Sequence, residues 1–160
     1  MNYYEEIKVI PFLKMFHLLS VVVWVGGMFF AYMVLRPSAA EILQPPERLR
    51  LWDKVFSMFF KWVWLSVVLV LASGFYMISL MGGFASLPMY INLMMLLGIV
   101  MTLIYFYVFF KDYAAYAVLV GKQEWPAAGA LLGTIRKLVG TNLGIGLLTV
   151  VVATIGVHLQ

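Results

Sequence analysis

Hydrophobic residues fill four long stretches of the chain, and polar residues gather between them. The stretches cover about residues 11–35, 55–81, 88–110 and 138–159. A bilayer core about 30 Å thick is crossed by roughly 20 apolar residues in a helix, and each stretch reaches that length. Little chain remains outside them. The pattern therefore predicts an all-α integral membrane protein in which residues 1–160 form one domain, a four-transmembrane-helix up-down bundle.

Prolines and polar segments suggest where these helices begin and end. The first span is expected to stop at Arg36-Pro37, because proline disfavours a helical conformation in the residue before it. The segment 38–54 is the most polar of the chain and contains Pro45-Pro46, so it is predicted to be a loop, with a short helix after Pro46 as an alternative for its second part. The third and fourth helices are expected to extend beyond the bilayer on the cytoplasmic side, over residues 113–120 and 126–135.

The composition agrees with a membrane protein and excludes several other classes. Only 11% of the residues are charged, whereas an ordinary globular domain carries about 25%. The net charge of +4 does not indicate nucleic-acid binding, because the basic residues lie at the ends of the spans, where anionic lipid head groups attract them. The chain has no cysteine, which excludes disulfides and thiolate metal sites. All seven acidic residues lie in segments that we expect to be aqueous.

The distribution of basic residues predicts an orientation in the membrane. Of the 11 lysines and arginines, nine lie in or beside the connections between spans one and two and between spans three and four, namely Arg36, Arg48, Arg50, Lys54, Lys61, Lys111, Lys122, Arg136 and Lys137. Only Lys8 and Lys14 lie on the opposite side. Basic residues are enriched on the cytoplasmic side of membrane proteins. We therefore expect both connections to be cytoplasmic and both termini to be periplasmic, in the cell inner membrane.

The chain has two histidines, which the predicted topology places at one depth. His17 lies 19 residues from Arg36, and His158 lies 21 residues from Lys137. At 1.5 Å per residue, both are about 28–32 Å from the cytoplasmic boundary and close to the outer face. First and last helices of an up-down bundle are usually neighbours. Two such imidazoles can ligate one metal ion or the two axial positions of a haem iron, although an interfacial histidine can also be an ordinary amphipathic side chain.

Several residues on the same helix faces are candidates for binding a cofactor. Trp24 and Gly27 follow His17 at helical spacing, and Gly146 lies on the face of the last helix that carries the second histidine. Small residues give a planar macrocycle the clearance that it needs, although tight helix packing explains them equally well. Asn92 on the third helix adds a polar group that is expected to face inwards.

Methionine and aromatic residues each allow a functional and an ordinary interpretation. The thioether of Met15, close to His17, is a soft ligand for Cu(I). The 11 methionines are scattered, however, which favours their general use as flexible fillers of apolar gaps. The aromatic residues between Trp52 and Trp64 flank Lys61 at the predicted cytoplasmic end of the second helix, and we interpret them as an interfacial aromatic belt.

Longer motifs carry a family resemblance. The segments LKMFHLL (13–19), VWVGGMFF (23–30), ASGFYM (72–77) and NLGIGLLT (142–149) resemble the copper-resistance D (CopD-like) membrane family, and the resemblance covers nearly the whole chain. The first helix, with a histidine followed seven residues later by Trp-x-Gly, is also similar to that of the HemJ-type protoporphyrinogen oxidases, which bind haem b. The resemblance implies that His17 is a haem or metal ligand.

The third span departs from the HemJ-type pattern. Those enzymes carry a histidine and a lysine at its start, where this chain has MYIN (89–92). This difference disfavours protoporphyrinogen oxidation. The chain also shows no phosphate-binding loop, no nucleophile with its base and no paired carboxylates, so catalysis is less expected than binding.

Three hypotheses follow for the function. The first is a membrane-embedded b-type haem protein, with His17 and His158 as axial ligands, that transfers electrons near the outer face to a quinone or a periplasmic protein. The second is copper binding, transport or homeostasis, with His17, His158 and Met15 as ligands. The third is a non-catalytic helical subunit of a larger membrane complex. The bilayer is a partner in each hypothesis, a second copy of the chain is a further candidate partner, and nucleic acid is not expected.

Overall fold

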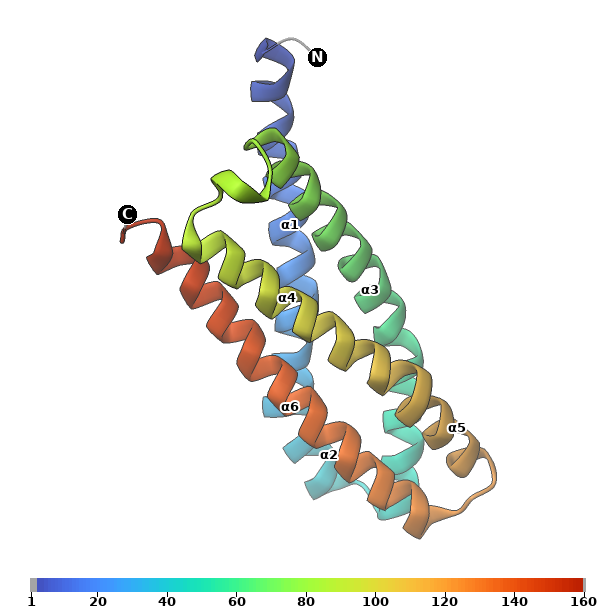
Figure 1. Ribbon diagram of the computed structural model, residues 1–160. Helices are drawn as coiled ribbons and strands as arrows, with labels where there is room; N and C mark the ends of the chain where they lie inside the picture. Colours follow the sequence, from blue (N-terminus) through green and yellow to red (C-terminus); the bar gives the residue numbers. More distant parts are fainter. Residues whose placement is uncertain (1–2, 160) are drawn as a thin grey trace.

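The computed structural model describes residues 3–159, with the side chains of 8–84 and 86–159, and contains no strand in that range. Four helical rods run alternately up and down beside one another (Figure 1). The first consists of α1 (Tyr3–Phe30), the π-helical turn η1 (Ala31–Leu35) and α2 (Arg36–Ile42). The second is α3 (Pro45–Leu80), and the short 3-10 helix η2 (Phe84–Ser86) follows it. The third consists of α4 (Met89–Tyr107), the π-helical turn η3 (Val108–Tyr113) and α5 (Ala114–Gly121), and the fourth is α6 (Trp125–Gly156).

The outer surface of the bundle is suited to lipid. All four rods are long and apolar enough to cross a membrane. Large hydrophobic side chains face outwards along them, including Phe12, Leu18, Val68 and Leu103, each more than half exposed. Contiguous apolar surface of this kind is not stable in water and indicates contact with a membrane. The chain is therefore a multi-pass membrane protein, and the prediction of an all-α bundle with four spans is confirmed.

The first connection is much shorter than we predicted. The loop expected over residues 38–54 is wrong in its length, because α2 continues to Ile42 and α3 begins at Pro45. A helix does begin at the two prolines, as the alternative expected, but it is long and not short. In a regular helix the ring of Pro37 would clash with the carbonyl group four residues earlier. The wider π-helical turn η1 ends at Leu35, two residues before Pro37, and accommodates the proline ring. At the start of α3, the backbone N–H of Gln44 donates to the carboxylate of Glu47 at 3.4 Å, so a two-residue connection suffices.

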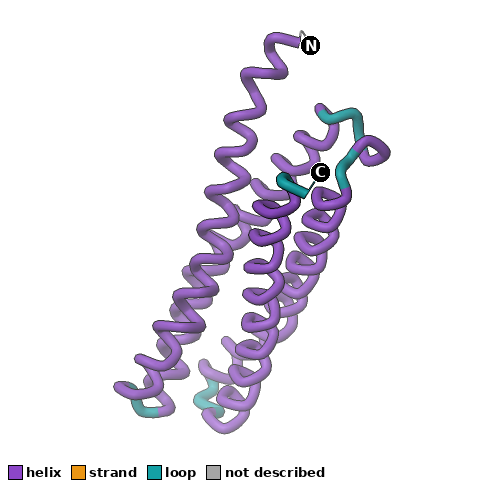
Figure 2. Tube along the Cα trace, turned by 90° about the vertical axis from the view of Figure 1, so that its left-hand side faces the viewer, coloured by secondary structure: helices purple, strands orange, loops and turns teal. Residues whose placement is uncertain are grey.

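The two termini lie at one end of the bundle, and the connections rich in basic residues lie at the other (Figure 1). The N-terminal turns of α1 project beyond the remaining helices (Figure 2). This helix begins at Tyr3, so Pro11 lies inside it and not in the first turn. At the same end, Gly82 and Gly83 have φ of +90° and +82°, a conformation that glycine adopts without strain, and they terminate α3.

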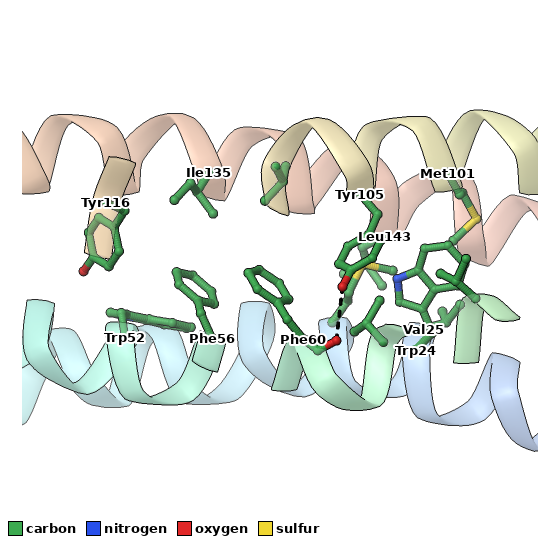
Figure 3. Packing of buried hydrophobic residues seen from close by; sticks show 14 of the residues in the cluster. Trp24, Val25, Trp52, Phe56, Phe60, Met101, Tyr105, Tyr116, Ile135 and Leu143 are labelled. Carbon is green, nitrogen blue, oxygen red and sulfur yellow. Dashed lines mark hydrogen bonds between the residues drawn. The ribbon is translucent and has the colours of Figure 1, made fainter. Parts of the chain in front are cut away.

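The interior is dominated by aromatic residues of α3 packed against α4 and α5. Trp52, Phe56 and Phe60 are buried and lie in a row along α3 (Figure 3). The hydroxyl of Tyr105 donates to the carbonyl oxygen of Phe60 at 3.1 Å. The interpretation of this segment as an interfacial belt is therefore wrong for these three rings, while Trp62 is 61% exposed and faces outwards.

Glycines allow the helices to approach one another closely. A Cβ atom on Gly27 of α1 would lie 2.5 Å from Cζ of Phe59 of α3, and one on Gly156 of α6 would lie 2.6 Å from Cγ of Tyr90 of α4. Helix α6 also meets α1, where Gly146 lies against Val25. The expected contact between the first and last helices is confirmed.

Candidate functional site

His17 lies on the face of α1 that packs against α3. Its Nδ1 atom is 3.0 Å from the hydroxyl oxygen of Ser73. That hydroxyl donates its own proton to the backbone carbonyl oxygen of Leu69, so it accepts a hydrogen bond from Nδ1–H of the imidazole. In the tautomer that this arrangement favours, the ring proton is on Nδ1 and the lone pair is on Nε2. A histidine in this tautomer, oriented by a second group, is in the form that ligates a metal.

The neighbouring residue of α3 provides the space for the imidazole. A Cβ atom on Gly74 would lie 3.4 Å from Cε1 of His17, so a larger side chain there would press on the ring. The sequence did not identify Ser73 as the partner of His17, because the two residues are 56 positions apart. The only sequence signal was the ASGFYM motif, in which Ser73 and Gly74 are adjacent.

The structure gives His158 a different environment from that of His17. Helix α6 ends at Gly156, and His158 follows in an exposed turn, where its backbone N–H donates to Ile155 at 2.9 Å. The C-terminal end of α6 lies apart from α1 in both views (Figures 1 and 2). There, Gly156 packs on Tyr90 of α4. No contact joins the two imidazoles, and the two-histidine site stays a prediction.

The remaining predicted residues of the first and fourth helices take part in packing. Trp24 is 4% exposed, and its indole meets the ring of Tyr105 edge-on at 6.1 Å. Phe59 covers Gly27, and a Cβ atom on Gly146 would lie 3.0 Å from a methyl group of Val25. The space beside both glycines is thus filled by protein side chains.

Met15 and Asn92 lie in positions that separate them from His17. Residues two apart on a helix point about 200° from each other, so Met15 and His17 face different sides of α1. The Met15 side chain is 43% exposed. The amide of Asn92 donates to the backbone carbonyl of Leu87 at 3.3 Å and so fixes the start of α4.

A cavity of about 620 Å³ lies in the other half of the bundle, towards the basic connections, and was not predicted from the sequence. Side chains of α1, α2, α3, α4 and α6 line it, among them the predicted residue Trp24 and the buried Asn142. Neither histidine lines it. Within the part of the chain that the structure describes, no three His, Cys, Asp or Glu side chains come together to hold a metal ion. The structure therefore separates the candidate ligand His17 from this cavity.

Comparison with known proteins gives one finding. The sequence profile of the family Copper resistance protein D (CopD) matches residues 53–155, which is well over half of the chain and extends from α3 to the end of α6. Helix α1 with His17 lies outside the matched segment, and the match does not bear on the similarity to HemJ-type enzymes. Curated proteins and solved structures gave no match. The resemblance seen in the sequence is confirmed, and this multi-pass membrane protein belongs to the copper resistance protein D family.

Proposed function

We propose that the protein handles copper as a cargo ion and binds it through Nε2 of His17 near the outer face of the cytoplasmic membrane. The observation that carries the proposal is the hydrogen bond from Nδ1 of His17 to Ser73, because it leaves Nε2 free to ligate a metal. Imidazole is a ligand that suits copper. Membership of the copper resistance family supports copper as the ion.

The proposed orientation follows from charge. Eight of the 11 basic residues lie in the half of the bundle opposite the termini, and Lys61 lies near the middle of α3. This bias supports a cytoplasmic location for that end. His17 then lies in the outer half of α1, where an ion from the periplasm reaches it first.

Thioethers deeper in the bundle are the proposed next ligands. Met28 lies on the same face of α1 as His17, about 16 Å further in. It is 3% exposed, and its sulfur accepts a hydrogen bond from the amide of Asn142 at 3.8 Å. Met101 of α4 is also buried and faces the neighbouring Gly146. Thioethers are soft ligands that select Cu(I), so these residues offer a second stage for an ion that moves inwards.

The hypothesis of a haem b electron carrier has less support. It needs His17 and His158 on one iron, and no contact brings them together. The large cavity offers a macrocycle no imidazole, because neither histidine lines it. The role of a ligand-free subunit in a larger complex has no specific observation in its favour.

Competition for Cu(I) against a chromophoric chelator tests the proposal on the purified protein. We expect wild-type protein to withdraw stoichiometric Cu(I), and His17→Ala to lose that ability. Ser73→Ala should weaken binding about 10- to 100-fold, as loss of an orienting group usually does. His158→Ala is the matched control and should bind like wild type. Wild-type protein that takes no copper would overturn the proposal, and equal losses in the two histidine variants would restore the two-histidine site.

A further inference from the structure

The cavity in the cytoplasmic half of the bundle has a strongly asymmetric lining. Three arginines from three helices line it, Arg36 of α2, Arg48 of α3 and Arg136 of α6, and no acidic residue does. The guanidinium of Arg36 lies 5.0 Å from the centre of the Tyr32 ring, and that of Arg48 is 3.5 Å from the carbonyl oxygen of Ala40. Neither contact neutralises a charge. The positive charge at this end of the cavity is therefore left for a ligand.

The exposed part of the lining shows where the cavity opens. Pro37 and Ala40 of α2, and Gly129 and Arg136 of α6, are exposed lining residues. A Cβ atom added to Gly129 or Gly133 would meet nothing within 4 Å. The mouth thus lies between α2 and the first half of α6, on the side of the bundle with the basic connections.

The cavity is long from its mouth to Asn142, and its deeper part is apolar. Its walls include the buried rings of Trp24, Trp52, Phe56 and Tyr105 (Figure 3). Along α6 the lining extends from Gly129 to Asn142, which is about 20 Å at 1.5 Å per residue. A space of this volume and lining is typical of sites that enclose a small apolar molecule.

One polar group at the deep end lacks a partner. Asn142 lines the cavity and is 3% exposed, and its Oδ1 atom accepts no hydrogen bond. Its amide nitrogen donates only to the weak acceptor sulfur of Met28. Buried polar atoms are nearly always satisfied, so this oxygen indicates a donor that the protein itself does not provide.

From these four features we infer that the cavity binds an acidic amphiphile. Its carboxylate or phosphate group lies among the three arginines at the mouth, its apolar body fills the aromatic interior, and a hydrogen-bond donor near its far end reaches Asn142. Both an acidic membrane lipid and a free fatty acid offer the anionic head and the apolar chain, and a hydroxyl group on that chain supplies the donor for Asn142. The site contains neither histidine and does not require copper at His17, but it shares one residue with the proposed copper route, because Met28 also lines the cavity.

Energy transfer from tryptophan to a dansyl group tests the inference, since Trp24 and Trp52 line the cavity. The full chain in phosphatidylcholine nanodiscs is titrated with dansylaminoundecanoic acid, which carries a carboxylate at one end and a sulfonamide N–H at the other. Empty nanodiscs correct for partition into the bilayer, and the methyl ester of the probe tests the need for the charge. We expect saturable transfer for the acid, and binding of the ester at least tenfold weaker.

Two glycine variants distinguish binding of the probe in the cavity from binding at the lipid-facing surface. Gly133→Leu places a large side chain at the mouth, where its Cβ atom would meet nothing within 4 Å. Gly144→Leu is its control, because Gly144 is exposed on the same helix, has the same open space for a Cβ atom and does not line the cavity. We expect Gly133→Leu to weaken binding at least tenfold and Gly144→Leu to leave it unchanged. The double variant Arg36→Gln/Arg136→Gln should weaken it similarly. Circular dichroism and gel filtration confirm that each variant is folded.

Competition by unlabelled molecules then identifies the source of the ligand. Displacement by oleate indicates a free fatty acid, and displacement by lysophosphatidylglycerol indicates a membrane lipid. The inference is overturned if wild type shows no saturable transfer above empty nanodiscs, if the ester binds as well as the acid, or if folded Gly133→Leu binds like wild type.

Discussion

Two adjacent glycines of α1 offer a sharp test of how the helices pack. A Cβ atom on Gly27 would lie 2.5 Å from Cζ of Phe59, whereas one on Gly26 would meet nothing within 4 Å. Alanine at either position has the same intrinsic advantage over glycine in a helix, about 0.8–1.0 kcal/mol. The difference in stability between Gly27→Ala and Gly26→Ala therefore isolates the contact between α1 and α3.

The distance between Gly27 and Phe59 allows the difference in stability between the two variants to be estimated. To restore an ordinary contact of 3.4 Å from 2.5 Å, the ring of Phe59 must move by at least 0.9 Å. The ring is half-buried and lines the cavity, so it can yield in part. Overpacking of this kind costs about 1–3 kcal/mol. We expect Gly27→Ala to be less stable than Gly26→Ala by that amount, and Gly26→Ala to be at least as stable as wild type.

Unfolding by SDS in mixed micelles, followed by circular dichroism, measures both variants on one scale. Equal stability of Gly26→Ala and Gly27→Ala would refute the reasoning. It would mean that Phe59 does not press on a side chain at position 27, and that α1 and α3 pack less closely there.

Three further predictions concern buried polar groups and orientation. Tyr116 is fully buried and its hydroxyl donates to the carbonyl oxygen of Leu49 at 2.8 Å, so Tyr116→Phe should lose about 0.5–1.5 kcal/mol in the same unfolding assay; unchanged stability would show that the bond contributes nothing. Asp112 is only 4% exposed and its Oδ2 atom has no hydrogen-bond partner, so Asp112→Asn should stabilise the protein by about 1–3 kcal/mol. A less stable Asp112→Asn would instead point to a bound cation or proton at this carboxylate. Alkaline phosphatase fused after Gln160 should be active outside the cell membrane, and an inactive fusion, with cytoplasmic activity of a matching reporter, would reverse the proposed orientation.

The number, order and approximate position of the helices could be predicted from the sequence, because the cost of placing polar backbone in lipid enforces long apolar helices. The first connection was mispredicted, since the effect of Pro37 depends on whether a π-helical turn precedes it. The expectation that all acidic residues are in water was also wrong, because Asp112 is buried.

Which side of each helix faces inwards was harder to predict. Lipid is as apolar as a protein interior, so periodicity does not distinguish the two faces of a transmembrane helix. For this reason Phe56 and Phe60 were assigned to an interfacial belt when they form the core. The bond between His17 and Ser73, and the cavity at the opposite end, depend on how the helices pair and tilt, and no single segment of the sequence contains that information.

The copper content and absorption spectrum of the protein, purified from membranes of cells grown with added copper, test the central proposal most directly. We predict about one copper ion per chain, lost in His17→Ala and kept in His158→Ala, and no Soret band. A Soret band that disappears in His17→Ala, from a preparation without copper, would contradict the proposal and establish a haem protein.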